Sequence, residues 1–212
     1  NDITQIMLNL PLELKNKDNA VNTVWDRDIP RARGDGWEAK VICGRFGGVS
    51  AGSPSPESWA HGDHGVRIVR LELDPSASVV VDRGMDGANR NIYFISGKDA
   101  SFNGTPVEKE SRVKLLENIE VTIVNGEEPS VIWLLEGKPI GQKMASFGPI
   151  YLANLKEVRA GLDEIRKNEY GEWPWQLIDS AQPLGSERFI RYPDREKAAG
   201  VILGLISRTS SL

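Results

Sequence analysis

The chain has 212 residues, of which 40% are hydrophobic and 26% are charged, and its formal net charge at pH 7 is −4. This composition is that of a globular protein with a sizeable core, and it excludes wholesale disorder. The acidic balance and the scattered Lys and Arg residues argue against direct contact with nucleic acid, which selects for clustered basic faces. No segment approaches the roughly 18 consecutive apolar residues of a membrane span, so we expect no membrane-spanning segment.

The first 36 residues predict a linker that consists of an edge strand and a loop. Residues 3–10 alternate loosely between apolar and polar side chains and end at Pro11, as an edge strand does. Residues 11–36 are rich in Asn, Asp, Lys, Arg and Gly and predict a loop. Residues 38–43 predict a short apolar strand. The six glycines and two prolines of residues 44–65 predict irregular backbone.

From residue 66 onward the sequence predicts short strands that are separated by turn residues. We expect strands over residues 66–73, 77–81, 91–96, 113–116, 119–124 and 130–135. The Asn103-Gly104 pair predicts a hairpin turn, because both residue types tolerate positive φ angles. Short strands at this spacing are typical of a sandwich or a small barrel rather than of alternating strands and helices.

One strong amphipathic helix is predicted over residues 155–167. Its apolar residues recur at helical spacing and form a single stripe, which consists of Leu155, Val158, Leu162 and Ile165. We expect Leu162 and Ile165 to be buried and the helix to close the barrel. Asn154 is the predicted N-cap, and Glu157 stands three residues on, as in a capping box.

The single cysteine, Cys43, excludes a disulfide within the chain and favours a reducing, intracellular compartment, cytoplasmic or nuclear. It lies in an apolar run, so we expect a small buried side chain rather than a reactive thiol. The final Ser-Ser-Leu faintly resembles a peroxisomal targeting signal, so an organelle is an alternative location. The first residue is Asn rather than Met, so we expect a processed chain or part of a longer one.

The residues offer no constellation that predicts catalysis. His61 and His64, with Asp63 between them, are the one cluster of metal-ligand types. Residues three apart face opposite sides of a strand, so a solvated loop explains the cluster better than a metal site does. No Gly-x-Ser-x-Gly nucleophile motif occurs, and the glycine-rich residues 44–48 lack the Lys-Ser/Thr pair of a phosphate loop. We therefore predict no catalytic and no metal-binding residues.

Eight short motifs, each weak alone, occur in the order in which the pirin family has them. Residues 136–141 (EGKPIG) and 147–154 (FGPIYLAN) resemble the signature near the end of pirins. Residues 6–11 (IMLNLP) resemble the strand that joins the two pirin barrels. The remaining matches are residues 41–44 with 53–54, 73–77, 93–97, 171–175 and 188–191. The resemblance spans about residues 3–195.

The resemblance to the pirin family implies an all-β fold, namely a cupin-type β-barrel or jelly roll with one C-terminal amphipathic helix. It divides the chain into a linker (residues 1–36), a metal-free C-terminal cupin barrel with its closing helix (37–170) and an irregular tail (171–212). The chain departs from the family at Leu155, where a Thr is usual, and in the charged loop and apolar tail extension.

Pirins are bicupins, so the resemblance implies that iron is held by three His and a Glu in a missing N-terminal half. When residues 93–97 are laid over the equivalent strand of that metal barrel, its His-x-His positions fall on Arg83 and Met85. Neither residue type is a plausible iron ligand there. We therefore expect no cofactor in this chain, and a vestigial pocket that includes Arg83, Met85 and Tyr93.

The resemblance implies a structural and protein-interaction module, or scaffold, because pirins resemble transcription co-regulators. In that case a protein partner is expected, either a metal-bearing cupin half or a larger complex. The alternative is part of an iron-dependent quercetinase-type dioxygenase whose metal site lies in the missing N-terminal half. A third hypothesis is a barrel whose pocket near Arg83 and Tyr93 takes a small anionic ligand.

Overall fold

The computed structural model describes residues 3–17, 23–52, 58–60, 62–168, 189–190 and 198–199. The chain divides into two compact units, Asn1–Val158 and Arg159–Leu212. Within the described residues, no helix combines the length and the apolar character that crossing a membrane requires. Of the predicted tail, only the short antiparallel pair β14 (Phe189–Ile190) and β15 (Ala198–Ala199) is described.

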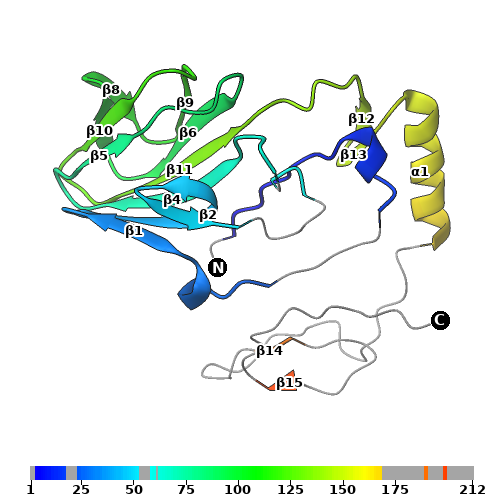
Figure 1. Cartoon of the computed structure of the whole chain (residues 1–212), viewed down its shortest axis with the longest axis horizontal. Coiled ribbons are helices and arrows are strands. Elements are labelled where there is room, and N and C mark those ends of the chain that lie inside the picture. Colours follow the sequence, from blue (N-terminus) through cyan, green and yellow to red (C-terminus); the bar gives the residue numbers. More distant parts are fainter. Residues whose placement is uncertain are drawn as a thin grey trace. The chain divides into compact units, whose positions relative to one another are not determined.

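Two antiparallel sheets form the body of the first unit (Figure 1). The larger sheet has the order β1-β2-β4-β11-β6-β9, with β3 paired to β2. Its strands are β1 (Arg31–Gly34), β2 (Trp37–Phe46), β3 (Val49–Ala51), β4 (Arg67–Leu73), β6 (Asn89–Ser96), β9 (Ser111–Leu115) and β11 (Ser130–Gly137). The smaller sheet has the order β5-β10-β7-β8. Its strands are β5 (Ser78–Val81), β7 (Asp99–Phe102), β8 (Thr105–Glu108) and β10 (Val121–Asn125).

The core lies between these two sheets, because alternate residues of each strand point into it. In β11, Ile132 and Leu134 are fully buried, and Val121 and Ile123 of β10 come from the other sheet. Side chains of successive strand residues point to opposite faces, so this period of two assigns each strand an inner face. Each buried aliphatic side chain stabilises the fold by about 1.5–3 kcal/mol. The all-β prediction with one helix is confirmed.

The predicted hairpin at Asn103 joins β7 to β8. Asn103 and Gly104 have φ angles of 48° and 78°, as a two-residue hairpin turn with positive φ at both positions requires. The Asn103 side chain also accepts a hydrogen bond from the Thr122 N–H at 2.8 Å and donates one to the Glu120 carbonyl at 3.2 Å. The turn residue therefore also fastens the hairpin to its neighbour β10.

The structure corrects the prediction for the first 65 residues. Residues 3–10 form no strand; Asn9 instead accepts a hydrogen bond from the Leu10 N–H at 2.9 Å and from Lys15 Nζ at 2.7 Å. Such local side-chain bonds compete with a strand ladder. The predicted loop contains β1, in which only Ala32 is buried, and the predicted irregular stretch contains β3. Short strands with mostly polar outward residues carry too little hydrophobic pattern to be detected.

The helix α1 (Leu155–Asn168) forms where the periodicity predicts it and follows the small hairpin of β12 (Ala145–Phe147) and β13 (Ile150–Leu152). Asn154 Oδ1 accepts the Glu157 N–H at 3.0 Å, and the Glu157 carboxylate accepts the Ala153 N–H at 3.3 Å. Asn154 is therefore the N-cap of α1.

The predicted burial of Leu162 and Ile165 is wrong. Val158 is 2% exposed, but Leu162 and Ile165 are half-buried and Leu155 is 59% exposed. Val158 is not a member of the core cluster between the two sheets. The closing role of the helix stays a prediction.

Candidate functional site

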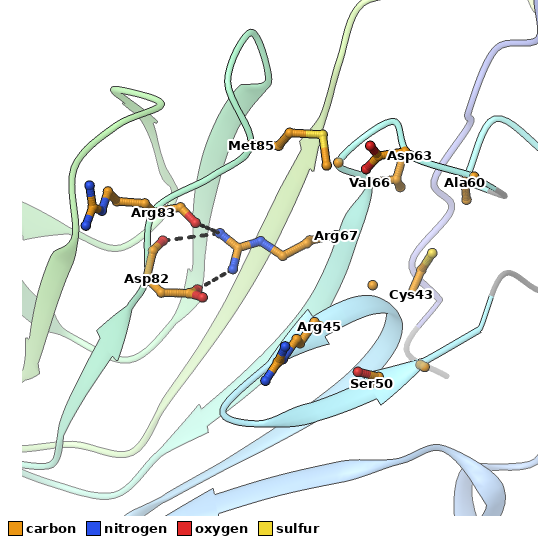
Figure 2. Close-up of a pocket in the computed structure, with 14 residues that line it drawn as sticks. Cys43, Arg45, Ser50, Ala60, Asp63, Val66, Arg67, Asp82, Arg83 and Met85 are labelled. Carbon is orange, nitrogen blue, oxygen red and sulfur yellow. Dashed lines mark hydrogen bonds and ion pairs between the residues drawn. The ribbon is translucent and has the colours of Figure 1, made fainter.

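A cavity of about 410 Å³ lies where β2, β3 and β4 approach the segment that follows β5 (Figure 2). Its wall includes Cys43 from β2, Ser50 from β3 and Arg67 from β4. Asp63, from the loop that precedes β4, also lines the cavity. The site is thus built from the ends of several strands and the connections beside them, which is a common place for a ligand pocket in a barrel.

Two of the three predicted pocket residues lie together in this cavity. Arg83 and Met85 both line it. The Arg83 guanidinium points away from Arg67, whereas the Arg83 carbonyl faces Arg67 and accepts a hydrogen bond from it at 3.4 Å (Figure 2). Arg83 therefore contributes its backbone, rather than its charge, to the arrangement around Arg67.

Tyr93 lies on the other face of the large sheet. Its neighbours in β6, Ile92 and Phe94, are both fully buried in the core, so Tyr93 points outward. It stands opposite Trp133 of β11 and is not part of the cavity wall. The structure therefore separates Tyr93 from Arg83 and Met85, because a motif match carries no information about strand parity.

A buried charge network next to the cavity was not predicted. Glu136 of β11 accepts hydrogen bonds from Arg67 Nε at 2.5 Å and from Arg90 Nε at 2.7 Å. The side chains of Glu136 and Arg90 are fully buried, and that of Arg67 is 10% exposed. One carboxylate is therefore shared between two guanidinium groups from β4 and β6. We call Arg67, Glu136 and Arg90 the buried triad.

The remaining donors of the buried triad are also satisfied. Arg67 pairs with the Asp82 carboxylate (Figure 2). Arg90 donates to the carbonyl of Asp82 at 2.6 Å, and to those of Leu116 and Ile119 at 2.7 and 2.8 Å. Among the described residues, no buried side-chain nitrogen or oxygen lacks a partner. The triad therefore closes one end of the barrel interior with charges that are all paired.

Burial alone would lower the pKa of Arg67, but the contacts with Glu136 and Asp82 outweigh it and raise that pKa. Arg67 thus keeps its positive charge across the ordinary pH range. The alternation of inward and outward residues along each strand could have revealed the triad. Arg67, Arg90 and Glu136 share the inward parity of Val69, Ile92 and Leu134, so the period-two pattern already directs all three charges into the barrel.

The histidine loop beside the cavity is held by contacts of its own. The rings of Trp59 and His64 stack with centroids 3.6 Å apart and an angle of 11° between their planes. Trp59 Nε1 donates to the Lys138 carbonyl at 3.0 Å, and the Lys138 N–H donates to the His64 carbonyl at 2.8 Å. His61 lies outside the described residues. His64 is therefore engaged with an aromatic ring.

Cys43 is 1% exposed, which confirms the predicted buried side chain. Desolvation raises the pKa of its thiol, which favours the less reactive protonated form.

The described residues of the cavity wall do not fit a metal ion. They include the side chains of Arg45 and Arg67, and Asp82 is already paired with Arg67. Within the part of the chain that the structure describes, no three His, Cys, Asp or Glu side chains gather in a way that could hold a metal. Guanidinium groups do not ligate metals, and their positive charge opposes a nearby cation.

Comparison with known structures shows the same fold. One crystal structure of quercetin 2,3-dioxygenase from Acinetobacter baumannii has a TM-score of 0.65 and 17% identity, covering 77% of this chain and 55% of that protein. A protein from Geobacillus kaustophilus has a TM-score of 0.52 and 20% identity, covering 64% of this chain and 53% of that protein. The chain thus spans about half the length of these proteins.

Sequence comparison identifies a similar family. No curated protein matches the chain significantly. Residues 68–171 match the family model of the pirin C-terminal cupin domain, and this range includes most of the barrel, the buried triad position Glu136 and all of α1. This part of the chain is therefore similar to the C-terminal cupin domain of pirins.

Proposed function

We propose that this chain is a non-catalytic cupin module with a structural and protein-interaction role, and that it pairs with a metal-bearing cupin half or joins a larger complex. Any iron would then belong to the partner half. The observation that carries the proposal is the buried triad beside the cavity. Arg67, Glu136 and Arg90 use their charges on each other and on neighbouring backbone, so they add strength and rigidity to the barrel rather than ligands.

The length of the similar structures supports the second half of the proposal. The chain covers 55% of the Acinetobacter baumannii quercetin 2,3-dioxygenase and 53% of the Geobacillus kaustophilus protein. A partner of roughly the size of this chain would complete such a two-barrel arrangement. The partner would supply the iron ligands that this chain lacks among its described cavity residues.

The alternative is that the chain is part of an iron-dependent dioxygenase of the quercetinase type. The likeness to quercetin 2,3-dioxygenase from Acinetobacter baumannii favours this possibility. In that case this barrel would contribute stability and part of the wall around a substrate bound in the other half. Its own cavity would still need no metal.

Two measurements test the proposal. We expect the purified chain, supplied with Fe(II), to leave quercetin unchanged under conditions in which the Acinetobacter baumannii enzyme oxidises it. Light scattering on the native protein from its source cells should report a mass above that of one 23.4 kDa chain. Iron-dependent turnover by the chain alone would contradict the non-catalytic role, and a stable native monomer would contradict the pairing.

A further inference from the structure

The central strand of the large sheet is apolar on both of its faces. On the inner face of β11, Ile132 and Leu134 pack into the core. Outward, β11 presents Val131, Trp133 and Leu135, all half-buried. A strand with one face in water usually alternates apolar and polar residues, whereas a strand covered on both faces is apolar throughout. The composition of β11 therefore indicates that something covers the outer face of the sheet.

The strand register extends this apolar surface across the neighbouring strands. Trp133 lies opposite Tyr93 of β6, and Tyr93 lies opposite Arg112 of β9. In the next row, Leu135 lies opposite Ile68 of β4. Side chains directly opposite each other in a sheet are neighbours about 4.5–5.5 Å apart at Cβ, so the rows form one surface. We call Ile68, Tyr93, Trp133, Leu135, Arg112 and Lys114 the outer patch.

The free positive charge of the outer patch lies on β9. Arg112 and Lys114 are exposed, and neither forms a hydrogen bond or ion pair with any residue that the structure describes. At the opposite side of the sheet, Arg31 and Lys40 each contact Asp26 at 2.7 Å. In a chain of net charge −4, an apolar centre flanked by unpaired cations is a distinct feature.

We propose that the outer patch binds a protein partner whose contact surface is acidic around an apolar centre. This inference rests on the proposed function, because it names the surface through which the module would interact. Trp, Tyr and Arg are the residue types that contribute most binding energy at protein interfaces, and the patch places one of each side by side. An acidic rim on the partner would pair with Arg112 and Lys114.

The charges of the outer patch favour an acidic protein partner over a second copy of the chain and over single-stranded nucleic acid. A second copy that docked through its own outer patch would place the cations Arg112 and Lys114 against the same cations of the first copy, because a two-fold interface uses the same surface on both chains. Single-stranded nucleic acid needs a continuous basic groove. On this face Lys40 is already paired with Asp26, and the exposed side chain of Glu72 is acidic. The basic residues therefore do not form a continuous groove.

The test uses the full chain and two labelled synthetic peptides, one alternating glutamate with leucine and one alternating lysine with leucine. Fluorescence anisotropy should show that the glutamate peptide binds and that salt weakens the binding. The double variant Arg112→Glu/Lys114→Glu should bind it roughly tenfold more weakly or worse, because unfavourable pairs replace favourable ones. The matched control Lys98→Glu/Lys109→Glu reverses two exposed cations outside the patch and should bind normally. Trp133→Ala should also bind more weakly, while circular dichroism shows a folded barrel.

Several results would overturn the inference. Equal binding by the patch variant and its control would remove the patch from the interaction. Tighter binding of an oligothymidylate than of the glutamate peptide would assign the patch to nucleic acid. A dimer that dissociates in the patch variant would assign it to a second copy. Iron-dependent turnover together with patch-dependent peptide binding would contradict the proposed function but support the patch. No turnover together with no peptide binding would contradict the patch alone.

Discussion

The large sheet carries charged side chains on both of its faces, and the two faces differ in how these charges are paired. On the inner face, Arg67, Arg90 and Glu136 are buried and each charge is paired. On the outer face of the same sheet, Arg112 and Lys114 are exposed and have no partner among the described residues. Because an unpaired charge is costly only where water is excluded, the inner charges need their partners, whereas the outer charges remain available for binding.

The largest expected effect comes from breaking the inner network. Glu136→Ala leaves Arg67 and Arg90 without their shared carboxylate, and we expect it to lower the free energy of unfolding by about 3–5 kcal/mol. Chemical denaturation followed by circular dichroism measures the change. Glu136→Gln keeps the shape and one acceptor and should cost less than Glu136→Ala. A loss below about 1 kcal/mol for Glu136→Ala would show that the triad does not stabilise the barrel.

A matched pair of adjacent leucines compares the two faces directly. Leu134 is fully buried on the inner face, and its neighbour Leu135 is half-buried on the outer face. We expect Leu134→Ala to lower the free energy of unfolding by about 2–5 kcal/mol. Leu135→Ala should cost about 1 kcal/mol or less in the isolated chain. Equal losses measured by denaturation would mean that the outer face is already covered by this chain itself.

The outer cations should matter little for folding. Arg112→Glu/Lys114→Glu should change the free energy of unfolding by no more than about 0.5 kcal/mol per substitution, because neither residue has a partner to lose among the residues that the structure describes. Thermal denaturation beside the wild-type chain checks this. A large destabilisation would show that these cations have a structural role and would weaken the contrast between the faces.

The smallest expected effect concerns the loss of stability at acidic pH. The hydrogen bond from Lys40 lowers the pKa of Asp26 below 3.8, with further lowering by Arg31. A lowered folded-state pKa means that this contribution is present above the ordinary Asp pKa and is lost as pH falls through the lower folded value. Asp26 is exposed, so its effect should be small. Asp26→Asn should therefore slightly flatten the loss of stability below about pH 4. An unchanged acid profile would show that this pair contributes nothing measurable.

The two faces also explain how far the sequence could predict the structure. The strands β4, β5, β6, β9, β10 and β11 follow from their period-two pattern, and α1 follows from its stripe and its Asn154 cap. Of β7 and β8, the sequence predicted only the connecting turn at Asn103. β1 was missed because only Ala32 of its residues enters the core. The buried triad was missed because charged residues inside strands interrupt a hydrophobic pattern. Their inward position becomes clear only when every second residue is counted along the strand from a buried neighbour such as Ile92.

The outer patch depends on information that the sequence lacks. Tyr93, Trp133 and Arg112 lie in three separate strands, and only the register of β6 with β11 and β9 places them in one row. Tyr93, which the sequence suggested for a pocket, lies on the outer face instead of in the wall of the described cavity, because a motif does not specify which face of the sheet its residues occupy.

Metal analysis of the purified chain tests the central proposal most directly. The chain, produced in iron-supplemented medium and dialysed without chelator, is measured by mass spectrometry for iron, zinc and copper beside the Acinetobacter baumannii quercetin 2,3-dioxygenase. A cavity wall with the guanidinium groups of Arg45 and Arg67 should leave this chain with far less than one metal per chain. About one tightly held metal per chain, lost in His64→Ala, would contradict the account of a metal-free interaction module.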